Sequence, residues 1–198
     1  MNITMQKTIA TLLMGLIFCS LLMFTPTIGK SGDLSTFGDG KVKVRFYTDY
    51  FCPPCRDMEP GIEPIIRELV QDNIIGPTFA GTPFYKHSSL YVRQFLYAMN
   101  AKKDLETALF MGRSLIEAAR SAMDNEEKVQ TFLKCKRISL KTFDPRLNFE
   151  NLSRYLKENQ IDATPSCVIE TGGKKTKYVG ESDTINAFNQ LRKKKPNR

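Results

Sequence analysis

Apolar side chains recur along this chain at two different spacings, which predict strands in some segments and helices in others. From Val42 to Thr48, apolar and polar side chains largely alternate, and this pattern predicts a strand. The next segment, from Pro53 to about Val70, instead repeats its apolar residues at helical spacing and predicts a helix. Pro60-Gly61 should bend this helix, because a proline in a helix interior removes a backbone hydrogen bond.

The helical spacing dominates the middle of the chain, after a second strand that we expect at residues 74–80. Each segment of this helical block carries apolar residues three and four positions apart. The predicted helices cover residues 88–101, 104–123, 126–136 and 148–159.

The C-terminal part of the chain predicts a hairpin and a last helix. Strands are expected at residues 164–170 and 176–179, joined through Gly172-Gly173. A short helix at 184–191 follows, with Ser182 or Asp183 as its cap. The predicted order is therefore strand, helix, strand, helical block, hairpin and helix.

The first 29 residues have the pattern of an export signal. Lys7 precedes an apolar run, and Thr27 and Gly29 follow it at the relative positions that a signal peptidase prefers. We expect cleavage before Lys30, with an uncleaved N-terminal membrane anchor as the alternative, because the apolar run approaches the thickness of a bilayer. Residues 30–41 are rich in Gly, Ser and Asp and are expected to form a linker.

Length and charge limit the class of protein. The whole chain has 198 residues and a formal net charge of +8. Without the signal, about 170 residues remain, which is enough for one domain with a substantial core. Basic residues are dense at 192–198, which we interpret as a solvated tail. No segment interleaves aromatic and basic side chains, so we expect no nucleic-acid partner.

Cys52 and Cys55 bracket two prolines where the first predicted strand leads into the first predicted helix. Two thiols at this spacing can open and close a reversible disulfide. Because N–H groups at a helix N-terminus favour an anion, Cys52 should be held partly as thiolate, the form that attacks disulfides. A structural disulfide or half of a zinc site is the alternative. The other mature cysteines and His87 show no paired spacing, so we expect no metal and no cofactor.

Four features occur together in this chain. They are the segment 46–56 around the cysteines, Pro60 eight residues after Cys52, the loop 163–166 with its Thr-Pro step, and the helical block at 88–159 that precedes this loop. In this combination the chain resembles the thioredoxin-fold thiol:disulfide oxidoreductases, and within them it looks most like the DsbA-like exported branch. The resemblance covers residues 42–191, between the linker and the basic tail.

The resemblance implies both a fold and a mechanism. It implies an α/β thioredoxin-like domain at 42–191, with a central mixed sheet and flanking helices, into which an all-helical subdomain at about 88–159 is inserted. Cys52 is implied as the exposed nucleophile that forms a mixed disulfide with a client, and Cys55 as the buried resolving thiol.

The resemblance also implies the surroundings of the two cysteines. Pro165 is expected to be cis and to shape a substrate groove beside them. Thr164 is expected to offer main-chain groups to an extended substrate. Phe51, Pro53 and Pro54 flank the cysteines.

The chain departs from this family pattern at two positions. Many DsbA-like proteins have a histidine between the cysteines, where this chain has Pro53-Pro54, so we expect a weaker oxidant. Phe46 stands where thioredoxin-like proteins commonly hold a buried acid, six residues before Cys52. Asp49 could substitute for that acid, but an Asp at a strand end is more commonly a capping or turn residue.

His87 is interpreted as a helix-capping or surface residue, and the charges of Arg56 and Lys86 as ordinary surface solvation. Cys135 lies on the predicted helix 126–136, and Cys167 lies two residues beyond the Thr-Pro step. We interpret these two cysteines as separate small apolar side chains, with a second disulfide between them as the alternative.

The sequence predicts an exported, periplasmic or extracytoplasmic thiol:disulfide oxidoreductase that acts on client proteins with cysteines. The leading hypothesis is a monomeric disulfide oxidase that a quinone-linked membrane protein reoxidises. One alternative is a reductase or isomerase, for example in cytochrome maturation, with a membrane electron donor. The non-enzymatic alternative is a binding or chaperone module that holds extended chains.

Overall fold

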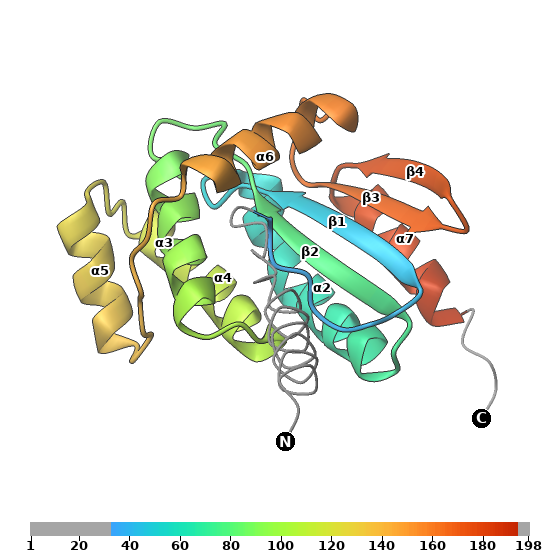
Figure 1. Ribbon diagram of the computed structural model, residues 1–198, viewed down its shortest axis with the longest axis horizontal. Coiled ribbons are helices and arrows are strands. Elements are labelled where there is room, and N and C mark those ends of the chain that lie inside the picture. Colours follow the sequence, from blue (N-terminus) through green and yellow to red (C-terminus); the bar gives the residue numbers. More distant parts are fainter. Residues whose placement is uncertain (1–32, 194–198) are drawn as a thin grey trace, which may run out of the picture. The chain divides into compact units, whose positions relative to one another are not determined.

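The computed structural model describes residues 33–193 (Figure 1). The predicted signal or anchor at 1–29 and the end of the basic tail, 194–198, lie outside the described residues. None of the described helices is long and apolar enough to cross a membrane. The elements in chain order are β1 (Val42–Thr48), α2 (Pro53–Gln71), β2 (Ile75–Gly81), α3 (Ser88–Ala101), α4 (Leu105–Arg120), α5 (Glu126–Cys135), α6 (Arg146–Glu158), β3 (Ser166–Thr171), β4 (Lys174–Val179) and α7 (Glu181–Lys193).

The strands form one mixed sheet in the order β2-β1-β3-β4. β1 runs parallel to β2, whereas β3 is antiparallel to both β1 and β4. Helices α3 to α6 all lie between β2 and β3 in the sequence. The thioredoxin-like fold with a helical insertion is therefore confirmed. Because β1 and β2 are parallel, the loops that follow them leave the sheet at the same edge.

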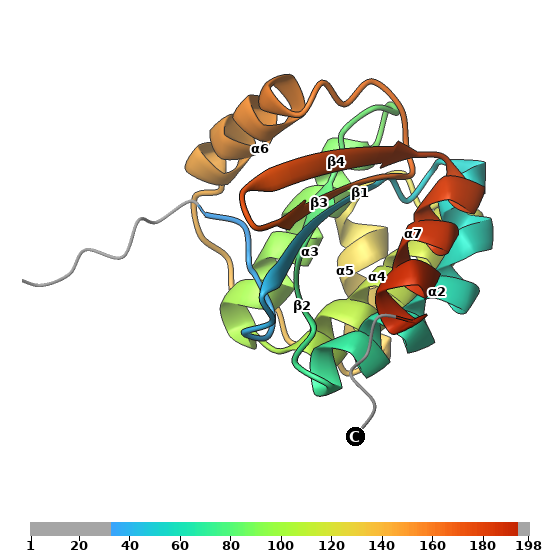
Figure 2. The ribbon, with the colours of Figure 1, turned by 90° about the vertical axis from the view of Figure 1, so that its right-hand side faces the viewer.

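One face of the sheet is covered by α2 and α7, which lie side by side (Figure 2). Val44 and Phe46 of β1 and Cys167 of β3 are buried on this face. The rings of Phe46 and Phe188 meet edge to face, with 6.1 Å between their centroids. Burying a large apolar side chain contributes about 1.5–3 kcal/mol, so this layer fixes α2, and with it the cysteines, on the sheet. The helix residues buried here are Met58, Ile62, Ile65, Ile66, Leu69, Ala187 and Phe188.

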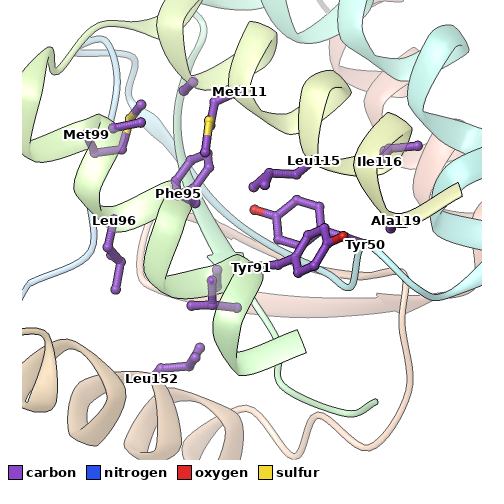
Figure 3. Close-up of a cluster of buried hydrophobic side chains, with 14 of the residues drawn as sticks. Tyr50, Tyr91, Phe95, Leu96, Met99, Met111, Leu115, Ile116, Ala119 and Leu152 are labelled. Carbon is purple, nitrogen blue, oxygen red and sulfur yellow. The ribbon is translucent and has the colours of Figure 1, made fainter. Parts of the chain in front are cut away.

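A second buried cluster joins the inserted helices to the domain (Figure 3). At its centre, the rings of Tyr50 and Tyr91 lie 6.0 Å apart. Tyr50 lies two residues after β1 and Tyr91 belongs to α3, so the cluster connects the active-site segment to the insertion. Helices α3, α4 and α6 supply most of the other side chains, which include Phe95, Leu96, Met99, Met111, Leu115, Ile116, Ala119 and Leu152.

Tyr47 does not lie on an exposed polar face of β1, as the sequence pattern predicted. We placed it with the polar residues of the alternating pattern, but it is completely buried. Its hydroxyl donates to the carbonyl of Tyr155 at 3.4 Å and accepts from the side-chain amide of Asn159 at 2.9 Å. Because α6 and the turn after it cover this side of the strand, β1 is buried on both faces at this point.

The prediction of a linker at residues 30–41 is partly wrong, because the second half of this segment packs onto the domain. Phe37 is only 5% exposed, and its N–H donates to the carbonyl of Pro77 at 2.9 Å. Gly40 lies so close to the backbone of Ile75 that an added Cβ would come within 2.3 Å of it. The folded domain therefore begins before β1, and position 40 requires glycine.

The last helix is longer than predicted. It begins at Glu181, so Ser182 and Asp183 lie in its first turn and do not precede it as caps. It continues to Lys193, which places Arg192 in the helix although we assigned it to the basic tail. The Arg192 guanidinium forms an ion pair of 2.9 Å with Glu68 of α2.

Helix α2 is one element from Pro53 to Gln71 and includes Pro60 and Pro64. Because Pro60 has no N–H, the carbonyl of Arg56 loses its helical donor. The Arg120 guanidinium of α4 lies 3.4 Å from this carbonyl and donates to it. The inserted subdomain therefore supports the helix at the position where the sequence predicted a bend.

Candidate active site

Cys52 is the N-cap residue of α2, and Cys55 lies in the first turn of this helix. Each residue is 3% exposed, so the resemblance was wrong to imply an exposed Cys52, whereas Cys55 is buried as it implied. Pro53 and Pro54 occupy the first helical positions, where a missing N–H breaks no intrahelical bond. They also remove two of the N–H groups that a helix N-terminus normally offers to an anion. The helix therefore offers Cys52 fewer backbone donors than an ordinary N-terminus would.

The loop before β3 meets Cys52 across the site. The Cys52 thiol donates a hydrogen bond to the carbonyl of Thr164, with 3.2 Å between sulfur and oxygen. The Thr164-Pro165 peptide bond is cis, and the carbonyl of Pro165 accepts from the N–H of Gly180 at 2.8 Å. The structure thus brings the predicted substrate-binding residues against the predicted nucleophile. The Thr164 carbonyl therefore already accepts a hydrogen bond, from the Cys52 thiol, when no client is bound.

The two cysteines lie in different electrostatic surroundings. Burial first, and to a smaller extent the adjacent Cys52 sulfur, raise the pKa of the Cys55 thiol to about 12. Cys52, in contrast, lies at the N-terminus of α2, where the helix dipole favours negative charge. No acidic side chain in the first turn opposes this field. The pair is therefore asymmetric, as a nucleophile and a resolving thiol need to be.

Asp49 is a buried structural residue at the end of β1. It has no exposed surface. Its carboxylate accepts hydrogen bonds from the N–H of Phe51 at 2.9 Å, the N–H of Phe84 at 3.0 Å and the hydroxyl of Ser88 at 2.9 Å. The turn role that the sequence suggested for Asp49 is therefore present. In addition, this carboxylate joins the active-site segment to the loop between β2 and α3.

Phe84 and Tyr85, in the loop after β2, are site residues that the sequence analysis missed. They are 42% and 47% exposed, which is unusual for large aromatic side chains. Burial, followed by the electrostatic effect of the nearby Cys52 and Asp49, raises the pKa of Tyr85 above its usual value. The signal that could have identified them is topological, because two parallel strands deliver the segments that follow them to the same edge of the sheet.

The other polar residues near the cysteines have different partners. His87 is the N-cap residue of α3 but makes no side-chain capping bond, and its ring lies 6.2 Å from that of Phe51. The Arg56 side chain donates to the carbonyl of Tyr50 at 2.7 Å. Lys86 is exposed. Phe51 itself packs edge to face on Tyr91, with 4.8 Å between the centroids.

A cavity of about 70 Å³ lies beneath the active site, between α2, α4 and the sheet. Its lining includes Cys55, Asp49, Glu59 and Glu63, together with mostly apolar side chains. One water needs about 10–15 Å³, so the cavity is large enough for several. Cys55 and Glu59 are four residues apart on one helix and therefore lie on the same face of α2.

Glu59 is a third site residue that the sequence analysis missed. Burial first, and then the neighbouring Glu63, raise its pKa to about 7. Burial alone would also raise the pKa of Glu63, but hydrogen bonds from Arg113 and Arg67 outweigh this effect and hold it below the usual value. Glu59 therefore exchanges its proton near neutral pH beside the resolving cysteine. The helical spacing from Cys55 could have revealed it.

Cys135 and Cys167 lie in different places. Cys135 is exposed at the end of α5, whereas Cys167 is completely buried on β3. Both thiols are free, so the structure of residues 33–193 does not contain the second disulfide that we considered. Burial raises the pKa of Cys167 to about 12, and this keeps the thiol protonated and unreactive.

Comparison with known families identifies one match over most of the chain. The sequence model of the thioredoxin family matches residues 37–189. This range begins at the buried Phe37 and includes both cysteines and the loop before β3. No curated protein sequence matches the chain.

Several solved structures have a similar fold. A periplasmic thioredoxin-like protein from Salmonella enterica serovar Typhimurium gives a TM-score of 0.60 at 18% identity, over 80% of this chain and 90% of that one. The catalytic domain of Proteus mirabilis ScsC gives 0.59 at 20% identity, over 80% and 89% of the two chains. Wolbachia pipientis α-DsbA1 gives 0.61 at 15% identity, over 81% and 90%. At these identities the comparisons establish the fold alone.

Proposed function

Since this chain belongs to the DsbA-like thioredoxin family of thiol:disulfide oxidoreductases, with Cys52 and Cys55 as its CXXC pair, we propose that it is an oxidase that inserts disulfides into exported proteins. The observation that carries this proposal is the asymmetry of the pair. Cys52 lies at a helix N-terminus, whereas burial raises the pKa of Cys55 to about 12. A helix field that favours thiolate at Cys52 stabilises the reduced form and so makes the disulfide more oxidising.

The first step uses the oxidised pair. A client thiolate attacks the sulfur of Cys52, a bond forms between these two sulfurs, and the Cys52–Cys55 bond breaks. Its electron pair stays on the sulfur of Cys55. Because the pKa of Cys55 is about 12, this leaving thiolate takes up a proton at neutral pH.

Glu59 is positioned to supply this proton. It lines the same cavity as Cys55, and its pKa of about 7 leaves a substantial protonated fraction at neutral pH. The cavity can hold water that connects the two groups. In the reverse direction, when the pair is reoxidised, Glu59 accepts the proton that Cys55 must lose before it can attack. This is general acid–base catalysis by a group whose pKa matches the working pH.

Client binding is assigned to the surface beside Cys52. Thr164 and the buried Pro165 form one side of this surface. The exposed Phe84 and Tyr85 form its other side. An extended client that approaches Cys52 would replace the thiol at the carbonyl of Thr164 with one of its own N–H groups, a form of strand addition that reads the backbone. Broad client range would follow.

The location and the recycling partner are parts of the same proposal. The apolar run in the first 29 residues has the pattern of an export signal, and the similar Salmonella protein is periplasmic. In that compartment the reduced Cys52 and Cys55 would be reoxidised by a quinone-linked membrane protein.

The test is the reduction potential of the pair, measured by equilibrating the domain in glutathione buffers and quantifying its free thiols. We expect a value on the oxidising side of about −200 mV, between the potentials of DsbA and the glutaredoxins. A more reducing value would overturn the oxidase assignment and favour a reductase. One observation favours that second function, since Pro53 and Pro54 remove two backbone donors from the helix N-terminus.

Assays with two different substrates distinguish an isomerase from an oxidase. An oxidase restores activity to a reduced test protein but does not rescue one whose disulfides are wrongly paired. We expect activity in the first assay only. Rescue of the mispaired protein at the same rate would contradict the proposal.

A further inference from the structure

An open groove of about 540 Å³ lies between the end of α3, the first half of α4 and the turn that follows α5. Its lining includes Lys102, Phe110, Arg113, Arg137 and Ile138. We propose that this groove is a docking site for an acidic segment of a partner protein, one that also carries an aromatic or aliphatic side chain. This inference goes beyond the proposed function and does not depend on it.

The groove is remote from the two cysteines. Phe110 and Arg120 belong to the same helix and lie about 15 Å apart along its axis. The Arg120 guanidinium donates to the carbonyl of Arg56, in the first turn of α2 beside the cysteines. Glu106, in contrast, lines the groove and pairs with Arg67, near the other end of α2. A partner in the groove therefore leaves the surface beside the cysteines free.

The lining of the groove is basic. It contains Lys102, Arg113 and Arg137, and one carboxylate, that of Glu106. The Arg67 guanidinium donates to both oxygens of this carboxylate, at 2.7 and 2.9 Å, so its charge is balanced before any ligand arrives. The field in the groove therefore favours an anion.

Three cations at the groove are not used within the protein. Lys103, Arg137 and Lys141 are exposed, and within residues 33–193 none of them forms an ion pair. Lys103 follows Lys102 in the chain, and the carbonyl of Lys141 accepts from the side-chain amide of Asn100 at 2.9 Å, which places it beside the end of α3. Three separate cations can bind several carboxylates at once. A short acidic segment supplies several carboxylates, whereas a small monovalent anion does not.

An exposed phenylalanine gives the groove an apolar part. Phe110 is 39% exposed, whereas its neighbours on α4, Leu109 and Met111, are buried. The Arg113 guanidinium lies 5.6 Å from the centre of the Phe110 ring. Ile138 adds a half-buried apolar side chain from the turn after α5. An apolar surface bordered by cations is typical of an interaction site for a segment that combines apolar and acidic side chains.

Both walls of the groove are fixed in the free protein. The Asp104 carboxylate caps α4 by accepting from the N–H of Thr107 at 2.9 Å. The N–H of Arg137 donates to the carbonyl of Lys134 at 2.9 Å and closes the turn after α5. The segment that follows this turn runs beside α3 (Figure 1). A preformed groove loses little conformational entropy on binding, so a short segment can bind with few contacts.

Another protein fits the groove better than a second copy of this chain or a bilayer does. The acidic stretch of this chain at 124–127 is engaged internally, since Asp124 pairs with Lys128 and Glu126 pairs with Arg93. A bilayer with anionic headgroups is flat, so it would contact the cations at the rim without filling the groove.

The test is fluorescence anisotropy with a labelled peptide of alternating glutamate and phenylalanine residues, titrated with the purified protein. Arg137→Asn with Lys141→Gln removes two of the unpaired cations, and asparagine tolerates the left-handed backbone at position 137. We expect this double variant to weaken binding about tenfold at low salt. Lys174→Gln with Lys193→Gln removes the same charge from β4 and α7 and should stay within about twofold of the wild type. No binding by the wild type, or equal losses in the two double variants, would overturn the inference.

The apolar part of the groove is tested by a separate variant. Phe110→Ser should weaken binding of the same peptide about fivefold, because the phenylalanine side chains of the peptide lose an apolar contact. Binding of a peptide with serine in place of phenylalanine should not change. A peptide with glutamine in place of glutamate should bind the wild type at least about tenfold more weakly. If the glutamine peptide binds equally well, charge complementarity does not select the ligand and the inference is overturned.

The other occupants give different results. Analytical ultracentrifugation would detect a second copy as an oligomer that Arg137→Asn with Lys141→Gln dissociates, and phosphatidylglycerol vesicles would detect a bilayer. Either result without binding of the acidic peptide would overturn the inference. These measurements contain no redox step, so the docking site and the proposed oxidase activity can fail independently.

Discussion

The carboxylate of Asp49 and the hydroxyl of Ser88, 39 residues apart in the chain, form a buried hydrogen bond of 2.9 Å. This bond connects the end of β1 to the start of α3. It therefore links the segment that carries the cysteines to the subdomain inserted after β2. Two further bonds to the same carboxylate, from Phe51 and Phe84, complete the connection.

Replacing Asp49 by alanine should therefore destabilise the protein and loosen the active site. Three donors, of which Ser88 is buried and Phe51 and Phe84 are partly buried, would lose their acceptor, and we expect the free energy of unfolding to fall by about 3 kcal/mol. Chemical denaturation measures this change. Asp57→Ala is the matched control, because Asp57 is exposed on α2 and should change stability by less than about 0.5 kcal/mol. Equal effects of the two substitutions would contradict this account of Asp49.

Glu59→Gln should change how stability depends on pH. The pKa of Glu59 in the folded protein is raised to about 7, so the folded state binds a proton more tightly than the unfolded state does. Wild-type stability should therefore fall as the pH rises from the ordinary glutamate range through 7. Glutamine has no carboxyl proton to lose, so this decrease in stability with rising pH is absent in the variant. We expect the variant to be more stable than the wild type above pH 7, by about 1 kcal/mol after solvent screening, and the difference to vanish in acid.

Denaturation curves across this pH range test the prediction. Glu150→Gln on the exposed side of α6 is the control and should leave the pH profile unchanged. Glu63, Arg113 and Arg120 are the charged groups around Glu59, and they are intact in both variants. A Glu59→Gln profile that runs parallel to the wild-type profile would exclude the raised pKa.

Glu59→Gln should also slow the exchange reaction. Without the carboxyl group, Cys55 loses the cavity residue whose pKa of about 7 suits proton transfer at neutral pH, and we expect the rate there to fall about tenfold to a hundredfold. Stopped-flow reoxidation of the reduced pair measures this step. A rate equal to that of the wild type would remove Glu59 from the mechanism.

Cys52→Ser and Cys55→Ala should have opposite effects on covalent complexes with clients. Cys55→Ala retains the nucleophile but cannot resolve the mixed disulfide, so complexes should accumulate. Cys52→Ser should form none. Non-reducing electrophoresis of cell extracts reports both results, and Cys135→Ser, which changes an exposed thiol on α5, should behave as the wild type. Complexes that accumulate with Cys52→Ser would reverse the roles of the two cysteines.

Gly40→Ala should destabilise the domain, whereas Gly61→Ala should stabilise it. A methyl group at position 40 would lie 2.3 Å from the backbone of Ile75, and the required shift should cost about 2–3 kcal/mol. At position 61, on the exposed side of α2, a methyl group meets nothing within 4 Å. Alanine there should add about 0.5–1 kcal/mol through its higher helix propensity. Thermal denaturation distinguishes the two, and losses of equal size would contradict the close approach at Gly40.

The sequence by itself determined the order of the elements, the fold and the pair of cysteines. These depend on local information, since apolar spacing separates strands from helices, and a CXXC motif at a strand–helix junction is contiguous in the chain. The thioredoxin-like arrangement was implied by a resemblance to a known family, which the cysteines, the Thr-Pro loop and the helical insertion carry together. The same local reasoning failed for Tyr47 and for the linker. Tyr47, and Phe37 in the predicted linker, are buried by segments that are distant in the sequence.

Only the tertiary structure showed which side chains surround the two sulfurs. The loop after β2 lies beside the active-site segment because β1 and β2 are parallel and Asp49 accepts hydrogen bonds from Phe51 and Phe84. The raised pKa of Glu59 depends on its burial between α2 and α4 and on the charge of Glu63. Proximity and desolvation are properties of packed elements, and neither is encoded by spacing along a single segment.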